Sequence, residues 1–302
     1  MDGLQKDLFL QFLRPGQIRE NEPMSRHTTF GIGGPADLFL MPSTPEELQL
    51  SLKAAKKAGI SVFVVGGGAN LLVRDKGIRG IVIHTGHLRY LKVRDHYMIV
   101  SAGMSTAEVA RAALGHHLSG LEFASGIPGT IGGAAYMNAG AYGSEMAEVI
   151  VSATICDSDG NLRRYGKADI NYGYRHSRFM GRSEVILDIT LSLKPGDEAG
   201  IKARMDELNG RRRLKQPLDK RSAGSTFKRP AGHFTGKMIE ELGLKGFSVG
   251  DARVSEKHAG FLINDGHASC RDMMALIAEV QRQVKEAYHV DLRPEVQIVG
   301  EE

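Results

Sequence analysis

Hydrophobic and polar positions along the chain follow both the helix and the strand period. A helix is predicted over residues 44–60. Thr44 can cap its start, Pro45 suits the first turn, and Glu47 stands three residues after the cap. A glycine should end this helix, and a short apolar strand is predicted at 61–65. The pattern is therefore helix, strand and then a run of glycines.

Short strands and helices continue to alternate further along the chain. A helix predicted at 105–117 opens with Ser105 and Glu108 as a capping box. A longer helix predicted at 269–288 carries an apolar stripe made of Met273, Ile277, Val280 and Val284. The remaining predictions are strands at 80–84, 97–101, 149–156, 184–193 and 260–263, and helices at 199–213 and 236–242. This mixture predicts an α+β fold, with a linker at 215–217 before a second domain.

The amino-acid composition indicates loops that bind ligands through backbone atoms. The chain has 302 residues, which suggests about two domains. Its 37 glycines are about 12% of the residues, against roughly 7% in average proteins. Glycine lets a ligand approach the main chain, so ligand loops are expected. The net charge of +4 is dispersed apart from 163–164 and 211–213, which favours an anionic small molecule over nucleic acid as the partner.

Cysteines and apolar runs bear on the compartment. Cys156 and Cys270 lie far apart, which gives neither a disulfide framework nor a CxxC metal motif, and a reducing compartment is expected. Residues 1–20 lack the basic start and apolar core of a signal peptide. No apolar run is long enough for a membrane span. We therefore expect a cytoplasmic protein without membrane insertion.

Two glycine-rich stretches are candidates for binding a dinucleotide. Residues 66–70 (GGGAN) follow a strand and could cradle a phosphate with backbone N–H groups. Leu71 stands where the third glycine of a Rossmann fingerprint should be. Residues 124–143 fit no period and offer the hydroxyls of Ser125 and Thr130. The two loops could clasp a pyrophosphate, or they could be a tight turn and a buried crossover.

Three further segments could carry chemistry. Residues 172–178 (YGYRHSR) hold two arginines beside aromatic residues, which suits a carboxylate or phosphate unless the loop is simply solvated. Ser225 lies in a tight turn before Lys228 and could donate a proton, although most such serines are turn residues. Glu295 follows a proline at the start of the last strand and could point into a cleft. The histidines form no HExxH motif, so no metal site is predicted.

Taken together, these segments resemble one enzyme family. The matching segments are 26–34, 66–72, 125–133, 174–179, 223–228 and 293–296. In this order they are similar to the UDP-N-acetylenolpyruvoylglucosamine reductases, flavoenzymes of bacterial peptidoglycan precursor synthesis. The chain has the length of the shorter form of that family, which lacks an added loop with a substrate tyrosine. The resemblance would link the protein to cell wall formation, cell shape, cell division and the cell cycle.

The resemblance implies a fold and its cofactors. The fold would be an FAD-binding domain of the vanillyl-alcohol-oxidase (PCMH) type in two lobes, with a smaller α+β substrate-binding domain. The lobes are expected at 1–59 with 292–302 and at 60–212, and the substrate domain at 213–291. FAD would be bound non-covalently and NADPH would give the hydride. The implied cofactor-binding residues are Val65, Gly66, Gly67, Gly68, Ala69, Asn70, Leu71, Ser125, Gly126, Ile127, Pro128, Thr130, Ile131, Gly132, Gly133 and Ala134.

The resemblance also implies catalytic roles. Hydride arriving at C3 of the enolpyruvyl ether leaves negative charge on C2 and its carboxylate. Arg175 and Glu295 match a clamp at that carboxylate, and Ser225 matches the proton donor. Glu295 would have to be protonated or share a proton there. The candidates for the UDP-sugar are Tyr174, Lys215 and Arg229. No protein partner is expected.

Two other functions compete with this one. One is a different flavin oxidoreductase built on the same cofactor domain, which should lack the segments at 223–228 and 293–296. The other is a flavin- or nucleotide-binding module without turnover. The arginine and serine motifs argue against such a module.

Overall fold

The computed structural model describes residues 3–302, so Met1 and Asp2 of the expected first lobe lie outside the described part. Its packing divides the chain into two compact units. The first unit comprises the residues up to Asn21, Asp37–Gly67 and Gly80–Arg211, and the second comprises Glu22–Ala36, Gly68–Arg79 and Arg212–Glu302. The chain therefore passes repeatedly from one unit to the other.

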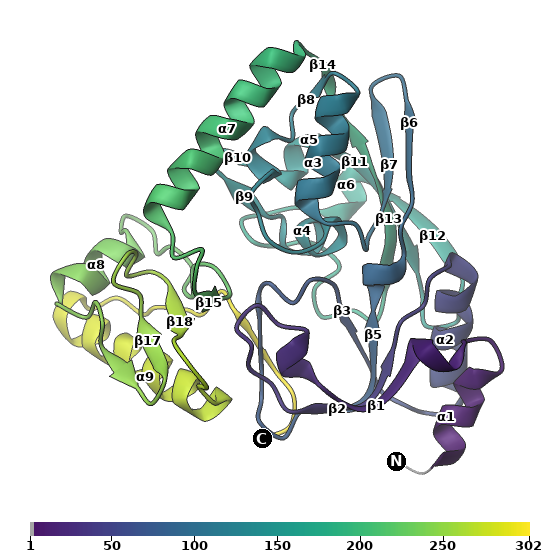
Figure 1. The fold of residues 1–302 in the computed structure, drawn as a ribbon, viewed down its shortest axis with the longest axis horizontal. Helices are drawn as coiled ribbons and strands as arrows, with labels where there is room; N and C mark the ends of the chain where they lie inside the picture. Colours follow the sequence, from purple (N-terminus) through teal and green to yellow (C-terminus); the bar gives the residue numbers. More distant parts are fainter. Residues whose placement is uncertain (1–2) are drawn as a thin grey trace. The chain divides into compact units, whose positions relative to one another are not determined.

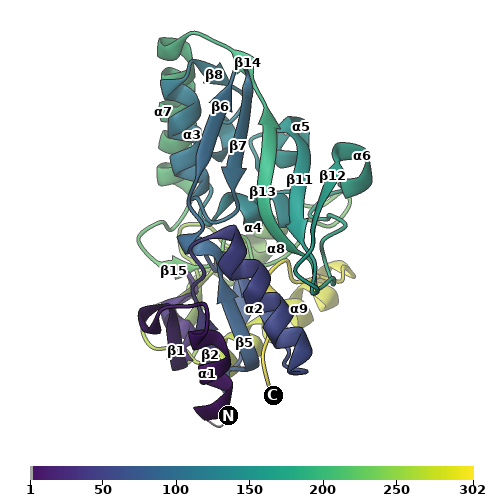
Figure 2. The same ribbon diagram turned by 90° about the vertical axis from the view of Figure 1, so that its right-hand side faces the viewer.

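The first unit begins with a small sheet of order β1-β2-β5-β3 (Figure 1). Its elements are α1 (Gly3–Leu10), β1 (Ile18–Pro23), β2 (Pro35–Leu40), α2 (Pro45–Lys57), β3 (Val62–Val65) and β5 (Ile78–His84). Strands β3 and β5 are parallel, with Val62 opposite Ile81. Figure 2 shows α2 beside these strands, and its buried residues Leu48 and Leu52 share a core with Ile81. The predicted cap of α2 is confirmed, because Thr44 Oγ1 accepts from the Glu47 N–H at 3.2 Å.

A larger antiparallel sheet of order β12-β11-β13-β7-β6 forms the rest of the first unit. The sheet strands are β6 (Leu91–Arg94), β7 (Tyr97–Ser101), β11 (Ile150–Cys156), β12 (Leu162–Gly166) and β13 (Val185–Ser192). The helices are α3 (Thr106–Gly115), α4 (Ile131–Met137), α5 (Met146–Val149), α6 (Lys167–Ile170) and α7 (Glu198–Lys215). Two short ribbons pair β8 (Leu118–Ser119) with β14 (Lys194–Pro195), and β9 (Gly140–Ala141) with β10 (Ser144–Glu145). The core lies between the sheet and α3, α4 and α5, with Val100, Ala135 and Ile189 fully buried.

The predicted capping box of α3 is present, and it makes stability depend on pH. Glu108 accepts from the Ser105 N–H at 3.0 Å and from Arg89 at 2.7 Å. These bonds, that from Arg89 first, hold the pKa of Glu108 at about 2, below its ordinary 4.5. A carboxyl with a lowered folded-state pKa stabilises the fold above its unfolded pKa and loses that contribution as pH falls.

We therefore expect Glu108→Gln to cost about 0.2–1 kcal/mol of unfolding free energy at pH 7. The difference from the wild type should shrink below about pH 4.5 and vanish near pH 2. Urea unfolding across this pH range measures it. An equal difference at pH 7 and pH 3 would show that the charge of Glu108 is unimportant.

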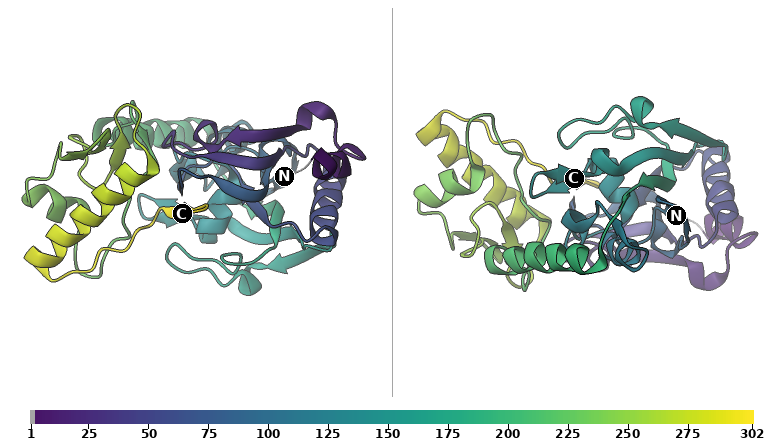
Figure 3. Two further views of the ribbon diagram at one scale, coloured as in Figure 1. Left: turned by 90° about the horizontal axis from the view of Figure 1, so that it is seen from below. Right: turned by 90° about the horizontal axis from the view of Figure 1, so that it is seen from above.

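The second unit packs an antiparallel sheet of order β15-β18-β17-β16 beside helix α9 (Figure 3). Its elements are β4 (Leu71–Val73), β15 (Arg221–Ser222), α8 (Thr235–Glu241), β16 (Ser248–Val249), β17 (Ala252–Val254), β18 (Leu262–Asn264), α9 (Cys270–Tyr288) and β19 (Gln297–Val299). The predicted stripe of α9 is confirmed, since all four residues are buried. The core also takes Phe30, Ile32 and Leu72 from distant segments.

The C-terminal strand β19 pairs in parallel with β4, with Ile298 opposite Leu72. Of the expected lobe at 1–59 with 292–302, Glu22–Ala36 share the second unit with the C-terminal residues, and the residues up to Asn21 belong to the first. The apolar pattern of β19 predicts a strand but does not choose its neighbour. Among residues 3–302, no helix has the length and apolar character needed to cross a membrane.

Candidate functional site

The first glycine loop leaves a row of backbone donors open. Within the described part of the chain, no atom accepts a hydrogen bond from the backbone N–H groups of 66–69. A Cβ on Gly66 would lie 2.3 Å from Thr130 Oγ1, and one on Gly67 would lie 2.6 Å from the Cα of Gly129. Only glycine permits this approach, so the two glycine-rich loops touch inside the first unit. Consecutive open N–H groups of this kind suit an anion such as a phosphate.

In the second glycine loop, some backbone N–H groups are hydrogen-bonded within the fold and others have no acceptor. Ile131 and Gly132 donate their backbone N–H groups to the carbonyls of Met104 and Ala102 at 2.8 and 3.0 Å. The N–H groups of Gly129 and Thr130 have no acceptor among residues 3–302. The backbone N–H groups of 129–130 are therefore open, whereas those of 131–132, at the start of α4, are hydrogen-bonded within the fold.

Ser125 is held by a residue that the sequence did not point to. Its side chain is 8% exposed, its hydroxyl donates to the Glu122 carbonyl at 2.9 Å, and it accepts from Asn209 Nδ2 at 3.1 Å. Asn209 belongs to α7, which begins over seventy residues later. A polar helix gave no sign of this contact, because only the tertiary fold brings α7 to the loop.

Arg175 is fixed on the second glycine loop. Its guanidinium donates to the carbonyls of Asn138 and Gly140 at 3.3 and 3.1 Å. Its backbone has φ 51°, which is unusual for a residue with a Cβ. Tyr174 beside it is 56% exposed, and the Arg175 Cζ lies 5.3 Å from the centre of the Tyr174 ring. The structure therefore brings together 124–143 and the segment of Arg175, with the guanidinium on neutral carbonyl oxygens.

Asn138 joins these two segments and was not predicted. It is fully buried, ends α4 with φ 46°, donates to the Gly173 carbonyl at 3.0 Å and accepts from the Ala147 N–H at 2.9 Å. Asparagine tolerates this left-handed conformation better than most residues. Its amide thus sets the path of the chain on both sides of Arg175.

We expect Asn138→Ala to lower the unfolding free energy by about 2–4 kcal/mol, because it adds backbone strain and leaves buried groups without partners. Asn138→Gly keeps the backbone conformation and loses only the two side-chain bonds, so it should cost about 1–3 kcal/mol. Urea unfolding of both variants measures the difference. A larger cost for glycine than for alanine would contradict the role assigned to the backbone.

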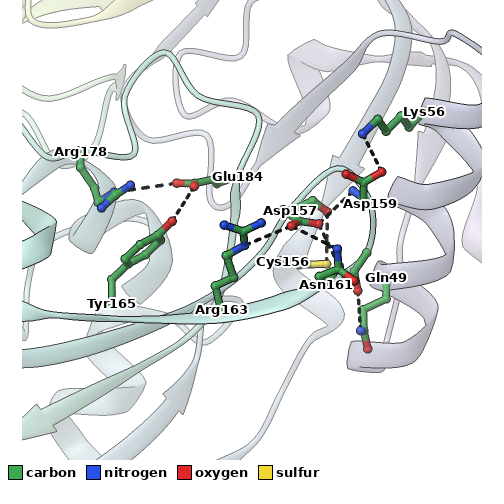
Figure 4. A network of polar contacts seen from close by, with 11 residues as sticks. Gln49, Lys56, Cys156, Asp157, Asp159, Asn161, Arg163, Tyr165, Arg178 and Glu184 are labelled. Atoms are coloured by element: carbon green, nitrogen blue, oxygen red, sulfur yellow. Dashed lines mark hydrogen bonds and ion pairs between the residues drawn. The ribbon is translucent and has the colours of Figure 1, made fainter.

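The second arginine of the 172–178 motif, Arg178, has contacts within the fold that Arg175 does not share. Figure 4 shows Arg178 with Glu184 and Tyr165. The Arg178 guanidinium lies 3.7 Å from the centre of the Tyr165 ring and 4.0 Å from Glu184, and the Tyr165 hydroxyl donates to Glu184 at 2.9 Å. Arg178 Nη1 also donates to the Asp169 carbonyl at 3.2 Å. This network fastens the far end of the Arg175 segment.

In the second unit, the segments of Ser225 and Glu295 lie side by side. The Glu295 N–H donates to the Thr226 carbonyl at 2.8 Å, and the Lys228 N–H donates to the Arg293 carbonyl at 2.8 Å. Thr226 is fully buried, and its hydroxyl accepts from the Leu262 N–H at 3.1 Å. Ser225 is exposed and Glu295 is half-buried. Two candidates seventy positions apart are thereby held on adjacent backbone.

The end of the first glycine loop joins the same group. Asn70 Nδ2 donates to the Glu295 carbonyl at 3.0 Å, and the Gln297 N–H donates to the Asn70 carbonyl at 3.0 Å. Leu71 then pairs with Gln297 in the β4–β19 ladder. A loop suited to an anion therefore continues into β4, which pairs with the strand that begins two residues after Glu295.

The remaining candidates are surface cations of the second unit. Lys215 is the exposed last residue of α7. Arg229 donates to the His233 carbonyl at 3.1 Å and stacks over Phe234, whose ring centre lies 3.8 Å away and whose side chain is 60% exposed. Tyr174 and Arg175 belong to the first unit, and Ser225, Glu295, Lys215 and Arg229 to the second. Their meeting around one substrate stays a prediction.

Neither cysteine has the properties of a nucleophile. Burial raises the pKa of the Cys156 thiol to about 12 and that of Cys270 to about 11. A thiol of this kind is inert because the thiolate is the reactive form. Among the described residues, no group of three or more His, Cys, Asp or Glu side chains could hold a metal ion.

Comparison with known proteins identifies the family. Residues 36–166 match the model of an FAD binding domain, and 216–299 match the C-terminal domain of UDP-N-acetylenolpyruvoylglucosamine reductase. A protein of that name from Caldanaerobacter subterraneus subsp. tengcongensis is 47% identical and covers 98% of each chain. One from Clostridium botulinum is 48% identical, with 98% of each chain covered.

Solved structures agree. UDP-N-acetylenolpyruvylglucosamine reductase (MurB) from Thermus caldophilus matches with a TM-score of 0.79 and 34% identity, covering 93% of this chain and 99% of its own. Alkyldihydroxyacetonephosphate synthase, at 15% identity and a TM-score of 0.52, covers 65% of this chain and 41% of its own and shares the fold. The FAD-binding domain and its companion domain define a flavin-dependent oxidoreductase, which confirms the predicted fold class. The chain belongs to the UDP-N-acetylenolpyruvoylglucosamine reductase family.

Proposed function

We propose that the protein reduces the enolpyruvyl group of UDP-N-acetylglucosamine enolpyruvate to give UDP-N-acetylmuramate, in the cytoplasm, during peptidoglycan precursor synthesis. NADPH is the hydride donor and non-covalent FAD the carrier. The observation that carries the proposal is the hydrogen-bonded junction of Asn70, the Ser225 segment and Glu295. This junction supports the proposal because Asn70, at the end of the predicted flavin loop, is hydrogen-bonded to Glu295, and Glu295 to the residue after Ser225, within one unit.

The glycine loops fit a flavin dinucleotide. Bound FAD supplies hydride transfer between NADPH and the substrate. The open N–H groups of 66–69 and 129–130 are donors for the pyrophosphate oxygens. These oxygens are negatively charged and act only as hydrogen-bond acceptors. Ser125, fixed by Asn209, offers a positioned hydroxyl. These contacts bind and orient the cofactor without a covalent link.

Arg175, Ser225 and Glu295 act on the enolpyruvyl group. Hydride added at C3 and a proton added at C2 together saturate the double bond. Arg175 balances the charge that develops on the carboxylate, because its guanidinium is already oriented by two carbonyls. The Ser225 hydroxyl gives its proton to C2. Tyr174, Lys215 and Arg229 hold the UDP-sugar, the two cations facing its diphosphate.

Glu295 acts in a state that donates a hydrogen bond, because a charged carboxylate would repel the developing negative charge. Glu295→Gln should therefore keep most of the rate at which the substrate reoxidises reduced flavin, and Glu295→Ala should lose it. Stopped-flow absorbance of the flavin measures both. A glutamine variant as slow as the alanine variant would contradict the hydrogen-bond role.

The proposal as a whole is tested by an anaerobic visible spectrum of the purified protein. Flavin bands should bleach with NADPH and return when the enolpyruvyl UDP-sugar is added. Bands that bleach but do not return would favour another flavin oxidoreductase on the same domain. Bands that do not bleach would indicate a binding module, and a colourless protein that takes up no added FAD would overturn the cofactor assignment.

A further inference from the structure

The first family-like segment, residues 26–34, has no role in the mechanism above, yet it lines a hollow in the second unit. The hollow has a volume of about 380 Å³. Its lining residues are Ser25, Arg26, Thr28, Thr29, Gly31 and Arg221. All six belong to the second unit, and we call this hollow the Arg26–Arg221 pocket.

The pocket holds two guanidinium groups without a counter-charge. Arg26 and Arg221 are exposed and make no ion pair or side-chain hydrogen bond with any residue from 3 to 302. Arg253, on strand β17 of the same sheet as Arg221, is by contrast paired with Asp265 at 2.9 Å. The carboxylate of Glu22, nearby in sequence, is buried and faces His27 at 2.9 Å. Two positive charges in one hollow repel each other unless an anion binds between them.

A buried hydroxyl completes the lining. Thr29 Oγ1 is buried and has no hydrogen-bond partner among the described residues. The Thr28 hydroxyl, by contrast, donates to the Ile32 carbonyl at 2.8 Å. The Thr29 N–H donates to the carbonyl of Gly68 at 3.1 Å, so the pocket adjoins the first glycine loop. An unpaired buried hydroxyl is costly and requires an explanation, and a phosphate oxygen would accept its proton.

The position of Arg221 is built into the fold. Arg221 begins β15, opposite Asn264 of β18. Asn264 is 3% exposed and donates to the Phe30 carbonyl at 2.9 Å, which ties the pocket segment to this sheet. Gly31 has φ +65°, and a Cβ there would lie 2.9 Å from Arg221 Cδ. The Arg221 side chain thus lies across bare backbone that only glycine provides.

We propose that the Arg26–Arg221 pocket binds a phosphate group of a nucleotide ligand. Guanidinium forks match two phosphate oxygens at once, and the Thr29 hydroxyl supplies a further donor. The inference rests on the proposed function, which brings three phosphate-bearing molecules to this protein: FAD, NADPH and the UDP-sugar. NADPH is the one with a phosphomonoester, whose charge of about −2 near pH 7 matches two guanidiniums.

The test compares Arg26→Gln, Arg221→Gln and Thr29→Val holoenzymes in three assays. Flavin release on dilution, followed by fluorescence, reports on FAD. Bleaching of the flavin by NADPH and by NADH reports on the 2′-phosphate, and reoxidation by the UDP-sugar reports on its diphosphate. Arg271→Gln is the control, because Arg271 is an exposed arginine of the same unit that does not line the pocket. Wild-type bleaching and reoxidation are established first, so failure of the proposed function is seen before any variant is compared.

Each arginine variant should weaken one of the three ligands by about 10- to 100-fold and leave the other two and the control unchanged. A loss confined to NADPH and absent with NADH identifies the 2′-phosphate. A loss confined to flavin retention or to the UDP-sugar identifies the corresponding diphosphate. Unchanged binding of all three ligands, or an equal loss of binding for all three, would overturn the proposal. Because both arginines are exposed, their loss should not prevent folding, and Thr29→Val gives an independent variant of similar volume.

Discussion

Replacing Ser225 by alanine should slow the reoxidation of reduced flavin by the UDP-sugar by about 10²–10⁴-fold, the usual contribution of a positioned proton donor. Reduction of the flavin by NADPH should stay near the wild-type rate, because that step requires no proton at C2. The loop itself should not move. It is fixed through the backbone of Thr226, which donates to the Gly260 carbonyl at 3.0 Å and accepts from Glu295. Stopped-flow absorbance separates the two half-reactions.

The matched control is Ser222→Ala. Ser222 lies three residues before Ser225 at the end of β15, pairs through its backbone with Ile263, and is half-buried. It should leave both half-reactions unchanged. Normal reoxidation in Ser225→Ala would remove Ser225 from the mechanism, and equal losses in both serine variants would point to a disturbed loop.

Arg175→Lys should slow the same half-reaction by about 10²–10³-fold, as expected when one preorganised donor to a developing negative charge is lost. Lysine keeps the positive charge but lacks the planar guanidinium. In the proposed mechanism, the guanidinium donates to two carbonyl oxygens and to the substrate carboxylate at the same time. The unfolding free energy should fall by about 0.5–1.5 kcal/mol, because the lysine ammonium can still donate to one of the two carbonyls and only one hydrogen bond is lost. Flavin reoxidation and urea unfolding are measured on the same preparation.

Arg178→Lys, in the same segment, should affect the unfolding free energy more than the rate of flavin reoxidation. It should lower the unfolding free energy by about 1–3 kcal/mol, because it breaks the network with Tyr165 and Glu184, and should affect the rate much less. A loss of rate equal to that of Arg175→Lys would mean that both arginines touch the substrate, as the motif first suggested. Arg182→Lys, at an exposed position between them and β13, should change neither quantity.

Local signals predicted local structure well. The cap of α2 at Thr44, the capping box of α3 and the stripe of α9 depend on residues three or four positions apart, and each is present. The flavin-binding fold was predicted from six ordered segments, and the family and domain matches confirm it. In these cases the interacting residues are close together in the sequence, or the matching segments follow one another in a fixed order.

Contacts between distant segments could not be predicted. Asn138 fits no period, and its partners at Gly173 and Ala147 lie next to it only in the folded chain. Arg175 and Arg178 look equivalent in the motif, and only the placement of Glu184 and Tyr165 separates their roles. Arg26 and Arg221 are almost two hundred positions apart. A single sequence gives residue types at such positions but not which surfaces face each other.

The repeated passage of the chain between its two units has a consequence for biosynthesis. The core of the second unit requires Phe30 and Leu72, which leave the ribosome long before α9, their partner in that core. Until the last strand is translated, these early apolar segments have no place to pack and depend on the nascent chain remaining unaggregated. A gene fragment that encodes only 212–302 would likewise lack Phe30, Ile32 and Leu72 and should express as an insoluble product. Residues 212–302 of this enzyme therefore cannot be exchanged between relatives on their own, because the early segments that complete their core must be exchanged with them.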